Sequence, residues 1–196
     1  HSGELALARS QALANMRVFP TDVDAIITNA AGCGSGMQEY PLLFTKTDQE
    51  AEAVAFSDKV IDVCVFLDRI GIEPPPELPR ELNIAYHDAC HLAHAQGVKM
   101  QPRNLLTKIP GVNLVALPEA ELCCGSAGTY NLEQPATARE LGKRKAQLTH
   151  DSSAEVVVSG NIGCLVQLRT HLNGDGPAIP VMHTIEIIDR AYRDEL

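Results

Sequence analysis

Four cysteines have the types and spacing of a site for a soft metal centre. Cys90 is followed, after 32 intervening residues, by the adjacent pair Cys123 and Cys124, and after another 39 residues by Cys164. Thiolate sulfur is a soft ligand that selects zinc, copper(I) or iron–sulfur clusters. The pattern therefore predicts a metal centre, with ordinary buried cysteines as the simpler alternative.

The cysteine doublet favours a cluster of several metal atoms. Neighbouring side chains of an extended chain point apart, and a single zinc ion is usually held by cysteines spaced two to four residues apart. Successive thiolates reach two irons more easily than one zinc ion, so we expect an iron–sulfur cluster. A structural zinc module is one alternative. A thiol–disulfide catalyst using Cys123 and Cys124 is another, weakened by the strain of a disulfide between neighbours.

The segments that must position these cysteines alternate as in an α/β fold. Hydrophobic periodicity predicts helices over residues 4–16, 60–70, 104–109 and 135–148, and strands over 24–28, 82–86, 112–117 and 156–159. All cysteines except Cys64 fall at or near a strand end or a turn, where parallel α/β sheets bind their ligands. Cys64 lies in a helical run and is expected to be a small core side chain.

An internal repeat with an offset of 131 residues runs through the chain. The shift places segment 24–33 (DAIITNAAGC) over segment 155–164 (EVVVSGNIGC), so that Cys33 corresponds to Cys164. We expect an α/β fold of two pseudo-symmetric lobes, each a small, mainly parallel sheet flanked by helices. Residues 1–76 are predicted to be the C-terminal part of a truncated first repeat with its connecting segment, and residues 77–196 a complete second repeat. Cys33 would be a ligand of the truncated repeat.

The composition argues against two classes of partner. The chain of 196 residues has a formal net charge of −9, whereas nucleic-acid binders and binders of anionic membranes present basic surfaces. No stretch approaches the roughly 18 apolar residues of a membrane span, and no secretory signal pattern is present. We therefore expect a cytoplasmic protein with reduced thiols, no nucleic-acid partner and no direct membrane insertion.

Three sequence blocks resemble the cysteine-rich CCG domain shared by heterodisulfide reductase and its relatives. They are residues 86–92 (YHDACHL), 121–131 (ELCCGSAGTYN) and 159–167 (SGNIGCLVQ). The chain is most similar to the iron–sulfur subunit of glycolate oxidase (glycolate dehydrogenase). The chain begins within a helix pattern and lacks the ferredoxin-like motifs of that subunit. We therefore expect it to be a C-terminal part of such a subunit.

The resemblance implies a function in electron transfer. Cys90, Cys123, Cys124 and Cys164 would hold a 4Fe-4S cluster in a non-catalytic portion of a glycolate or related 2-hydroxy-acid oxidase. FAD-containing subunits would be the partners, and electrons would pass indirectly toward a membrane acceptor, placing the chain at the inner membrane face through its partners. The alternatives are a CCG subunit of a lactate-oxidising complex or of a heterodisulfide reductase complex.

One departure from the family pattern leaves the cluster type open. In the reductase relatives a complete repeat ends in a Cys-x-x-Cys pair and holds a non-cubane 4Fe-4S cluster on five cysteines, whereas Asn161 occupies the first position of that pair here. An ordinary cluster and zinc are the other options. His91, Asn161 and Gly125 are expected to surround the cluster without binding it, His91 by hydrogen bonding and Gly125 by permitting close approach. Iron–sulfur clusters are lost in air, so aerobically prepared protein would lack one.

Overall fold

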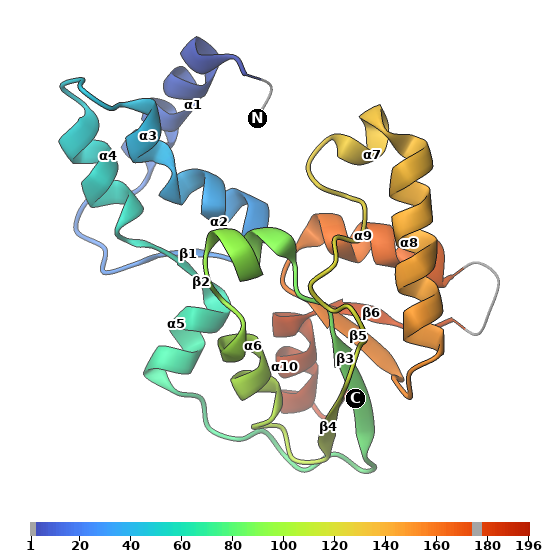
Figure 1. The fold of residues 1–196 in the computed structure, drawn as a ribbon. Helices are drawn as coiled ribbons and strands as arrows, with labels where there is room; N and C mark the ends of the chain where they lie inside the picture. The colour runs from blue at the N-terminus through green and yellow to red at the C-terminus, as the bar shows by residue number, and fades with distance from the viewer. Residues whose placement is uncertain (1–2, 174–177) are drawn as a thin grey trace.

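In the computed structural model, residues 3–173 and 178–196 form an α/β fold with two parallel sheets flanked by helices, which confirms the expected fold class (Figure 1). The larger sheet has the strand order β4-β3-β5-β6, and the smaller sheet pairs β1 with β2. The strands are β1 (Ile26–Thr28), β2 (Val60–Asp62), β3 (Leu82–Tyr86), β4 (Val112–Val115), β5 (Val156–Ser159) and β6 (Val181–His183).

Helices cover both faces of the larger sheet. The helices of the described residues are α1 (Leu5–Val18), α2 (Ala31–Gln38), α3 (Tyr40–Leu43), α4 (Glu50–Ser57), α5 (Val63–Ile70), the short π-helix η1 (His91–Ala95), α6 (Met100–Leu106), α7 (Tyr130–Glu133), α8 (Pro135–His150), α9 (Ile162–Leu172) and α10 (Thr184–Tyr192). Helices α5, α6 and α10 share one core cluster with Val156 and Val158, whereas α8 and α9 share another with Val157. Strand β5 is therefore buried on both faces, as a central parallel strand should be.

The 131-residue repeat is visible in the order and register of the elements. Helix α1, strand β1 and helix α2 correspond to α8, β5 and α9, and the first residue of α2, Ala31, corresponds to Ile162, the first residue of α9. The pairing of Ile27 with Ile61 recurs as that of Val158 with Met182. We call the part built from α1–α4, β1 and β2 the first lobe and the part around the larger sheet the second lobe. The division at residues 76 and 77 stays a prediction.

Two expectations about local structure were wrong. The segment 60–70 is not one helix: residues 60–62 form β2, and α5 begins at Val63, where the Asp62 carboxylate accepts a hydrogen bond from the Cys64 N–H at 2.8 Å. The β-branched Val60 and Ile61 favour a strand, and Asp62 is a strong helix cap. The segments holding Cys33 and Cys164 are not turns but the first turns of α2 and α9.

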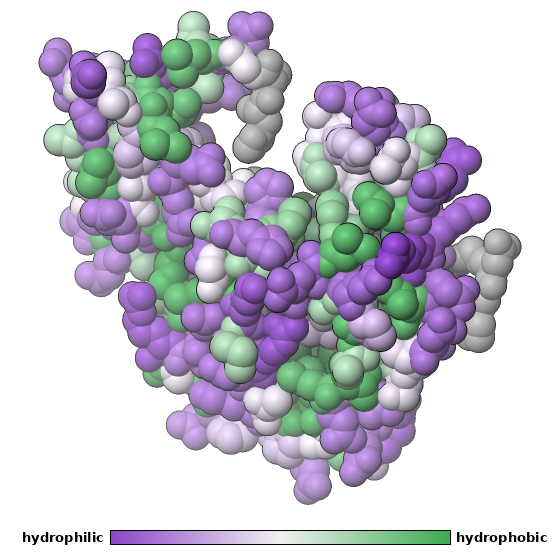
Figure 2. Space-filling model, in the orientation of Figure 1, coloured by the Kyte–Doolittle hydropathy of each residue, from purple (hydrophilic) through white to green (hydrophobic). Residues whose placement is uncertain are grey.

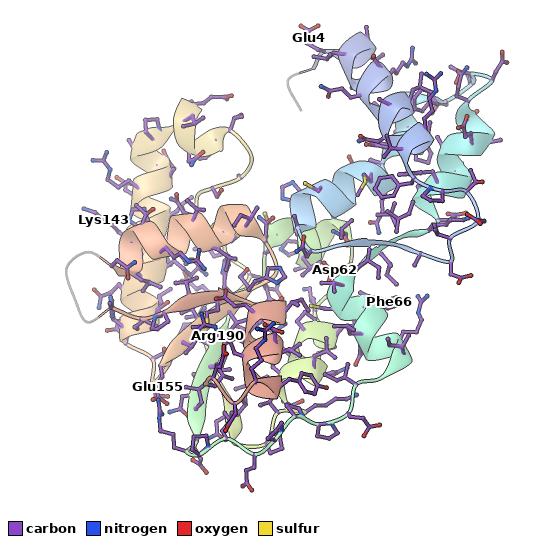
Figure 3. The ribbon with its side chains drawn as sticks, turned by 180° about the vertical axis from the view of Figure 1, so that it is seen from behind. Glu4, Asp62, Phe66, Lys143, Glu155 and Arg190 are labelled. Carbon is purple, nitrogen blue, oxygen red and sulfur yellow. The ribbon has the colours of Figure 1, made fainter. Side chains whose placement is uncertain are left out.

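The first lobe is attached to the second by α5 and by the start of α2. Figure 3, seen from behind, shows Asp62 at the start of α5, where the smaller sheet meets the second lobe. Figure 2 shows hydrophilic residues over most of the visible face, with smaller hydrophobic groups on both lobes. None of the helices in the described residues is long and apolar enough to cross a bilayer.

Candidate metal centre

Cys90 lies just beyond the carboxyl end of β3. The His87 N–H donates to the Val158 carbonyl at 2.9 Å, which extends the pairing of β3 with β5 by one residue. The chain then turns into η1, and the Cys90 sulfur lies 3.5 Å from the His91 Nδ1. Because β4 and β5 flank β3 on opposite sides, the connections diverge here, and such a point is where open α/β sheets form a ligand crevice.

A buried ion pair fixes the turn that carries Cys90. Asp88 is 4% exposed, and its two carboxylate oxygens accept hydrogen bonds from the two terminal nitrogens of Arg103 on α6, both at 2.8 Å. The guanidinium also lies over the Tyr86 ring, 4.7 Å from its centroid. The Asp88 hydrogen bond raises the pKa of Arg103. Two-pronged pairing of this kind gives orientation as well as attraction, so α6 holds the segment before Cys90 in place.

The loop that carries Cys123 and Cys124 is held against α8. The Gly125 N–H donates to the Cys123 sulfur at 3.3 Å. Gly125 has φ +95°, and a Cβ on it would lie 2.5 Å from the Ala138 carbonyl oxygen in α8. The sequence suggested that Gly125 permits close approach to the cluster. In the structure, the group that approaches it closely is the backbone of α8. A side chain there would push the cysteine loop away from α8.

Two neighbouring cationic side chains on α8 bind the turn at Glu119, which precedes this loop. Arg144 pairs with the Glu119 carboxylate, and the fully buried Lys145 donates to the Glu119 carbonyl. Burial lowers the pKa of Lys145. The Leu122 N–H closes the same turn by donating to the Glu119 carbonyl at 2.9 Å.

Cys164 sits in the first turn of α9, directly after β5. The Asn161 amide nitrogen lies 3.5 Å from the Cys164 sulfur, and the Asn161 side-chain oxygen accepts from the Gly32 N–H of α2 at 3.4 Å. Asn161 therefore links this sulfur to the first lobe. The positive end of the α9 dipole also favours a thiolate at this position.

The four predicted cysteines converge on one place in the second lobe. Sulfur contacts join Cys90 to Cys123, Cys123 to Cys124, and Cys124 to Cys164. The ligand atoms of Cys124, Cys164 and His87 all lie within 4.8 Å of one another, and all three side chains are buried. The soft donor set predicted from the sequence is thus assembled at the carboxyl ends of β3 and β5.

The four thiols cannot all ionise at this distance, and their pKa values separate. Hydrogen bonds with Cys124, and then with Cys90, lower the pKa of Cys123. Contact with Cys124 lowers the pKa of Cys164, and His87 and Asn161 lower it further by smaller amounts. Contact with Cys123 is the main reason that the pKa values of Cys90 and Cys124 are raised. Without a metal the site holds thiolates stabilised by neighbouring thiols, and a bound cation would displace the remaining protons.

Two cysteines lie outside this group. Cys33 is exposed in the first turn of α2 and lines a hollow of about 740 Å³ in the first lobe. Cys64 is buried in the core shared by α5, α6 and α10, and burial raises its pKa. The expectation that Cys64 is a core side chain is confirmed.

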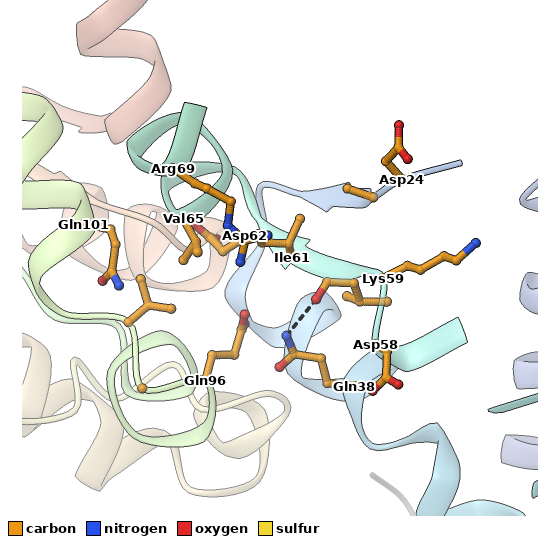
Figure 4. A pocket seen from close by; sticks show the side chains of 14 residues that line it. Asp24, Gln38, Asp58, Lys59, Ile61, Asp62, Val65, Arg69, Gln96 and Gln101 are labelled. Carbon is orange, nitrogen blue, oxygen red and sulfur yellow. Dashed lines mark hydrogen bonds between the residues drawn. The ribbon is translucent and has the colours of Figure 1, made fainter. Parts of the chain in front are cut away.

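A polar cavity near the junction of the two lobes is separate from the cysteines. It has a volume of about 280 Å³, and Figure 4 shows the Gln38 amide within it donating to the Val60 carbonyl at 3.0 Å. Asp62, Arg69 and Gln96 also line it, and none of its lining residues is a cysteine.

Sequence reasoning placed the cysteines but missed three side chains around them. His87 was noted only as a neighbour of Cys90, yet it lies against Cys124 and Cys164. The sequence did contain a signal for this: His87 follows Tyr86 at the end of a strand, and side chains alternate, so the two residues must lie on opposite faces of the sheet. Arg103 and Lys145 come from helices distant in sequence and carried no such signal.

Comparison with known proteins agrees with the cysteine site. Residues 84–169, which include all four converging cysteines, match the family model of the cysteine-rich CCG domain. The chain is 29% identical over 191 residues to lactate utilization protein A of Oceanobacillus iheyensis, covering 96% of this chain and 78% of that protein. The family-model match confirms the CCG resemblance inferred from the three sequence blocks.

Two further relatives are longer. The chain is 34% identical to the probable glycolate oxidase iron-sulfur subunit of Bacillus subtilis, covering 90% of this chain and 40% of that protein. It is 32% identical to one of the subunits of the fumarate reductase (CoM/CoB) of Methanothermobacter marburgensis, covering 99% of this chain and 37% of that protein. The chain therefore spans less than half the length of these two relatives.

Proposed function

We propose that this chain, whose residues 84–169 carry a cysteine-rich CCG domain, is the iron–sulfur electron-transfer portion of a complex that oxidises glycolate or a related 2-hydroxy acid. The observation that supports it best is the convergence of Cys90, Cys123, Cys124 and Cys164 at one end of the larger sheet. The names of the relatives, a glycolate oxidase iron-sulfur subunit and a lactate utilization protein, agree with this assignment.

The proposed cofactor is a 4Fe-4S cluster held by these four cysteines. Four thiolates provide one ligand for each of four irons, and the adjacent pair suits two different metal atoms better than one. When bound, such a cluster takes up and releases single electrons. The donor set fits because all four ligands are soft thiols that come together at one place.

The surrounding residues act on the electron density of the sulfurs. The Gly125 N–H and the Asn161 amide each lie near a cysteine sulfur, at 3.3 Å and 3.5 Å respectively. Hydrogen bonds to ligand sulfur stabilise the reduced, more negative state and raise the reduction potential. Burial of Cys124 and Cys164 keeps water from that side of the site. The chain's own contribution is thus to bind the cluster and set its potential.

The chemistry of substrate oxidation is assigned to other subunits. We assign the oxidation to FAD-containing partner subunits, because the converging thiols of this chain are suited to holding an electron carrier. Electrons would then pass through this chain toward a membrane acceptor, with the chain on the cytoplasmic side and attached to the membrane only through its partners.

A structural zinc ion is the second candidate. The compact group of His87, Cys124 and Cys164 favours it, because a nitrogen and two sulfurs within 4.8 Å can share one ion. In that case the domain would hold subunits together and carry no electrons.

A redox titration separates the two functions. Protein reconstituted anaerobically with iron and sulfide should show a reversible one-electron transition in its visible absorption. The transition should be lost in Cys164→Ser and retained in Cys64→Ala, whose thiol lies in the core away from the site. If the protein is colourless, binds one zinc ion and shows no transition, the electron-transfer function is wrong and the structural zinc function takes its place.

A further inference from the structure

His87 is a fully buried polar side chain at the cysteine site. Its side chain is 0% exposed, and neither ring nitrogen has a hydrogen-bond partner among the described residues. Its ligand atom lies within 4.8 Å of the sulfurs of Cys124 and Cys164, and the ring lowers the pKa of Cys164, so its neighbours at this site are the two sulfurs. Burying an imidazole without a well-formed hydrogen bond costs free energy, and a bond from the ring to a metal would offset that cost.

The neighbouring residues do not supply that hydrogen bond. The carboxylate of Asp88, next to His87 in sequence, is fully engaged by Arg103 through both of its oxygens. By contrast, the half-buried His183 caps α10, where its Nδ1 accepts the Ile185 N–H at 3.2 Å, while its Nε2 has no partner among the described residues. His183 thus has one ring nitrogen in a hydrogen bond, whereas His87 is fully buried against cysteine sulfurs.

The backbone fixes the direction of the His87 side chain. Its N–H donates to the Val158 carbonyl at 2.9 Å, so the residue continues strand β3. Tyr86 lies in the core shared with α5, α6 and α10, and alternation along the strand sends His87 to the opposite face, where Cys124 and Cys164 belong to another core cluster. The ring is thus held at the metal site by the sheet and not by a mobile loop.

We propose that His87 is a direct ligand of the metal centre, giving one iron of the cluster a nitrogen donor beside the four thiolates. Neutral imidazole binds iron through either ring nitrogen. The ligand atoms of His87, Cys124 and Cys164 lie close enough together for one metal atom to contact all three. A neutral nitrogen adds no negative charge to the cluster, whereas a fifth thiolate at this position would, so the reduction potential is higher with histidine than with cysteine here.

This inference rests on the proposed cluster, and isotope labelling tests it without altering the protein. The chain is prepared with ¹⁵N-histidine, reconstituted anaerobically, reduced, and measured by pulsed EPR. The expected result is a strong nitrogen hyperfine coupling that changes with the isotope. A cluster signal with only weak histidine coupling, as hydrogen bonding through His91 would give, overturns the ligand. Absence of any cluster in the wild-type protein overturns the proposed function itself, so the two failures differ.

Substitutions give a second, independent readout. His87→Cys replaces the nitrogen ligand with a thiolate, so the strong nitrogen coupling should disappear while iron and sulfide content is kept and the reduction potential falls. The matched control is His94→Ala, an exposed histidine on η1, which should leave coupling and potential unchanged. Strong coupling that persists in His87→Cys would exclude His87 as the nitrogen donor.

Discussion

Replacing Arg103 by Met should destabilise the protein strongly, because it leaves the Asp88 carboxylate buried without its partner. Asp88 is 4% exposed and Arg103 28% exposed, and the two pair through both carboxylate oxygens at 2.8 Å. Met keeps most of the apolar stem of Arg103 and removes the charge. The perturbation therefore isolates the ion pair and the stacking on Tyr86.

The expected loss follows from the burial of this pair. Removing one partner of a buried pair costs about 3–5 kcal/mol, and the partial exposure of Arg103 favours the lower end, about 3 kcal/mol. For a chain of this size each kcal/mol shifts the melting temperature by about 2–4 °C, so Arg103→Met should lower it by about 6–12 °C. Because Asp88 lies two residues before Cys90, metal loading should fall as well.

The control is an ion pair on the surface of the same sheet. Arg80 and Glu155 lie 2.6 Å apart with side chains 65% and 38% exposed, and such pairs contribute at most about 1 kcal/mol. Thermal and urea unfolding of Arg80→Met and Arg103→Met would be compared, with the double variant Asp88→Asn/Arg103→Met expected to recover part of the loss. Equal, small effects of Arg80→Met and Arg103→Met would refute the view that the buried pair anchors the Cys90 turn.

Three other predictions concern the metal site. Gly125→Ala should lower the free energy of unfolding by at least about 2 kcal/mol in urea, because its φ is +95° and the new Cβ would lie 2.5 Å from α8. Gly128→Ala, with φ +65° and nothing within 4 Å, should cost only about 1 kcal/mol, and equal losses would contradict this account. Because the raised pKa values of Cys90 and Cys124 keep both thiols protonated, metal binding must release two protons. Zinc affinity, measured by chelator competition, should fall about 100-fold for each pH unit of acidification down to the pKa of Cys164, about 5, and a flat profile would count against it. Asn161→Ala should lower the reduction potential of the reconstituted protein because a cysteine sulfur loses its amide neighbour, and an unchanged potential would show that this amide has no such effect.

The strands and the cysteine site were predictable because their signals are local. Strand β3 was expected over residues 82–86 and runs over those residues, and β5 likewise over 156–159. An apolar run between turn residues identifies a buried strand, and cysteines at successive strand ends must meet at one edge of a parallel sheet. The repeat also needed nothing beyond the sequence itself.

The missed features depend on contacts between segments far apart in the chain. Strand β2 looked helical because Val60–Asp62 runs without a break into the apolar helix α5, and only pairing with β1 distinguishes the two. Lys145 stands in a Lys-Arg-Lys sequence typical of an exposed helix face, yet the turn at Glu119 buries it. His87 likewise gains its importance only when α9 brings Cys164 beside it.

The most direct measurement of the central claim is the iron and acid-labile sulfide content of protein reconstituted without oxygen. The account predicts about four irons and four sulfides per chain, reduced to background in the double variant Cys123→Ser/Cys124→Ser and unchanged in Cys64→Ala. A single tightly bound zinc ion, no metal at all, or iron that persists in the double variant would contradict it.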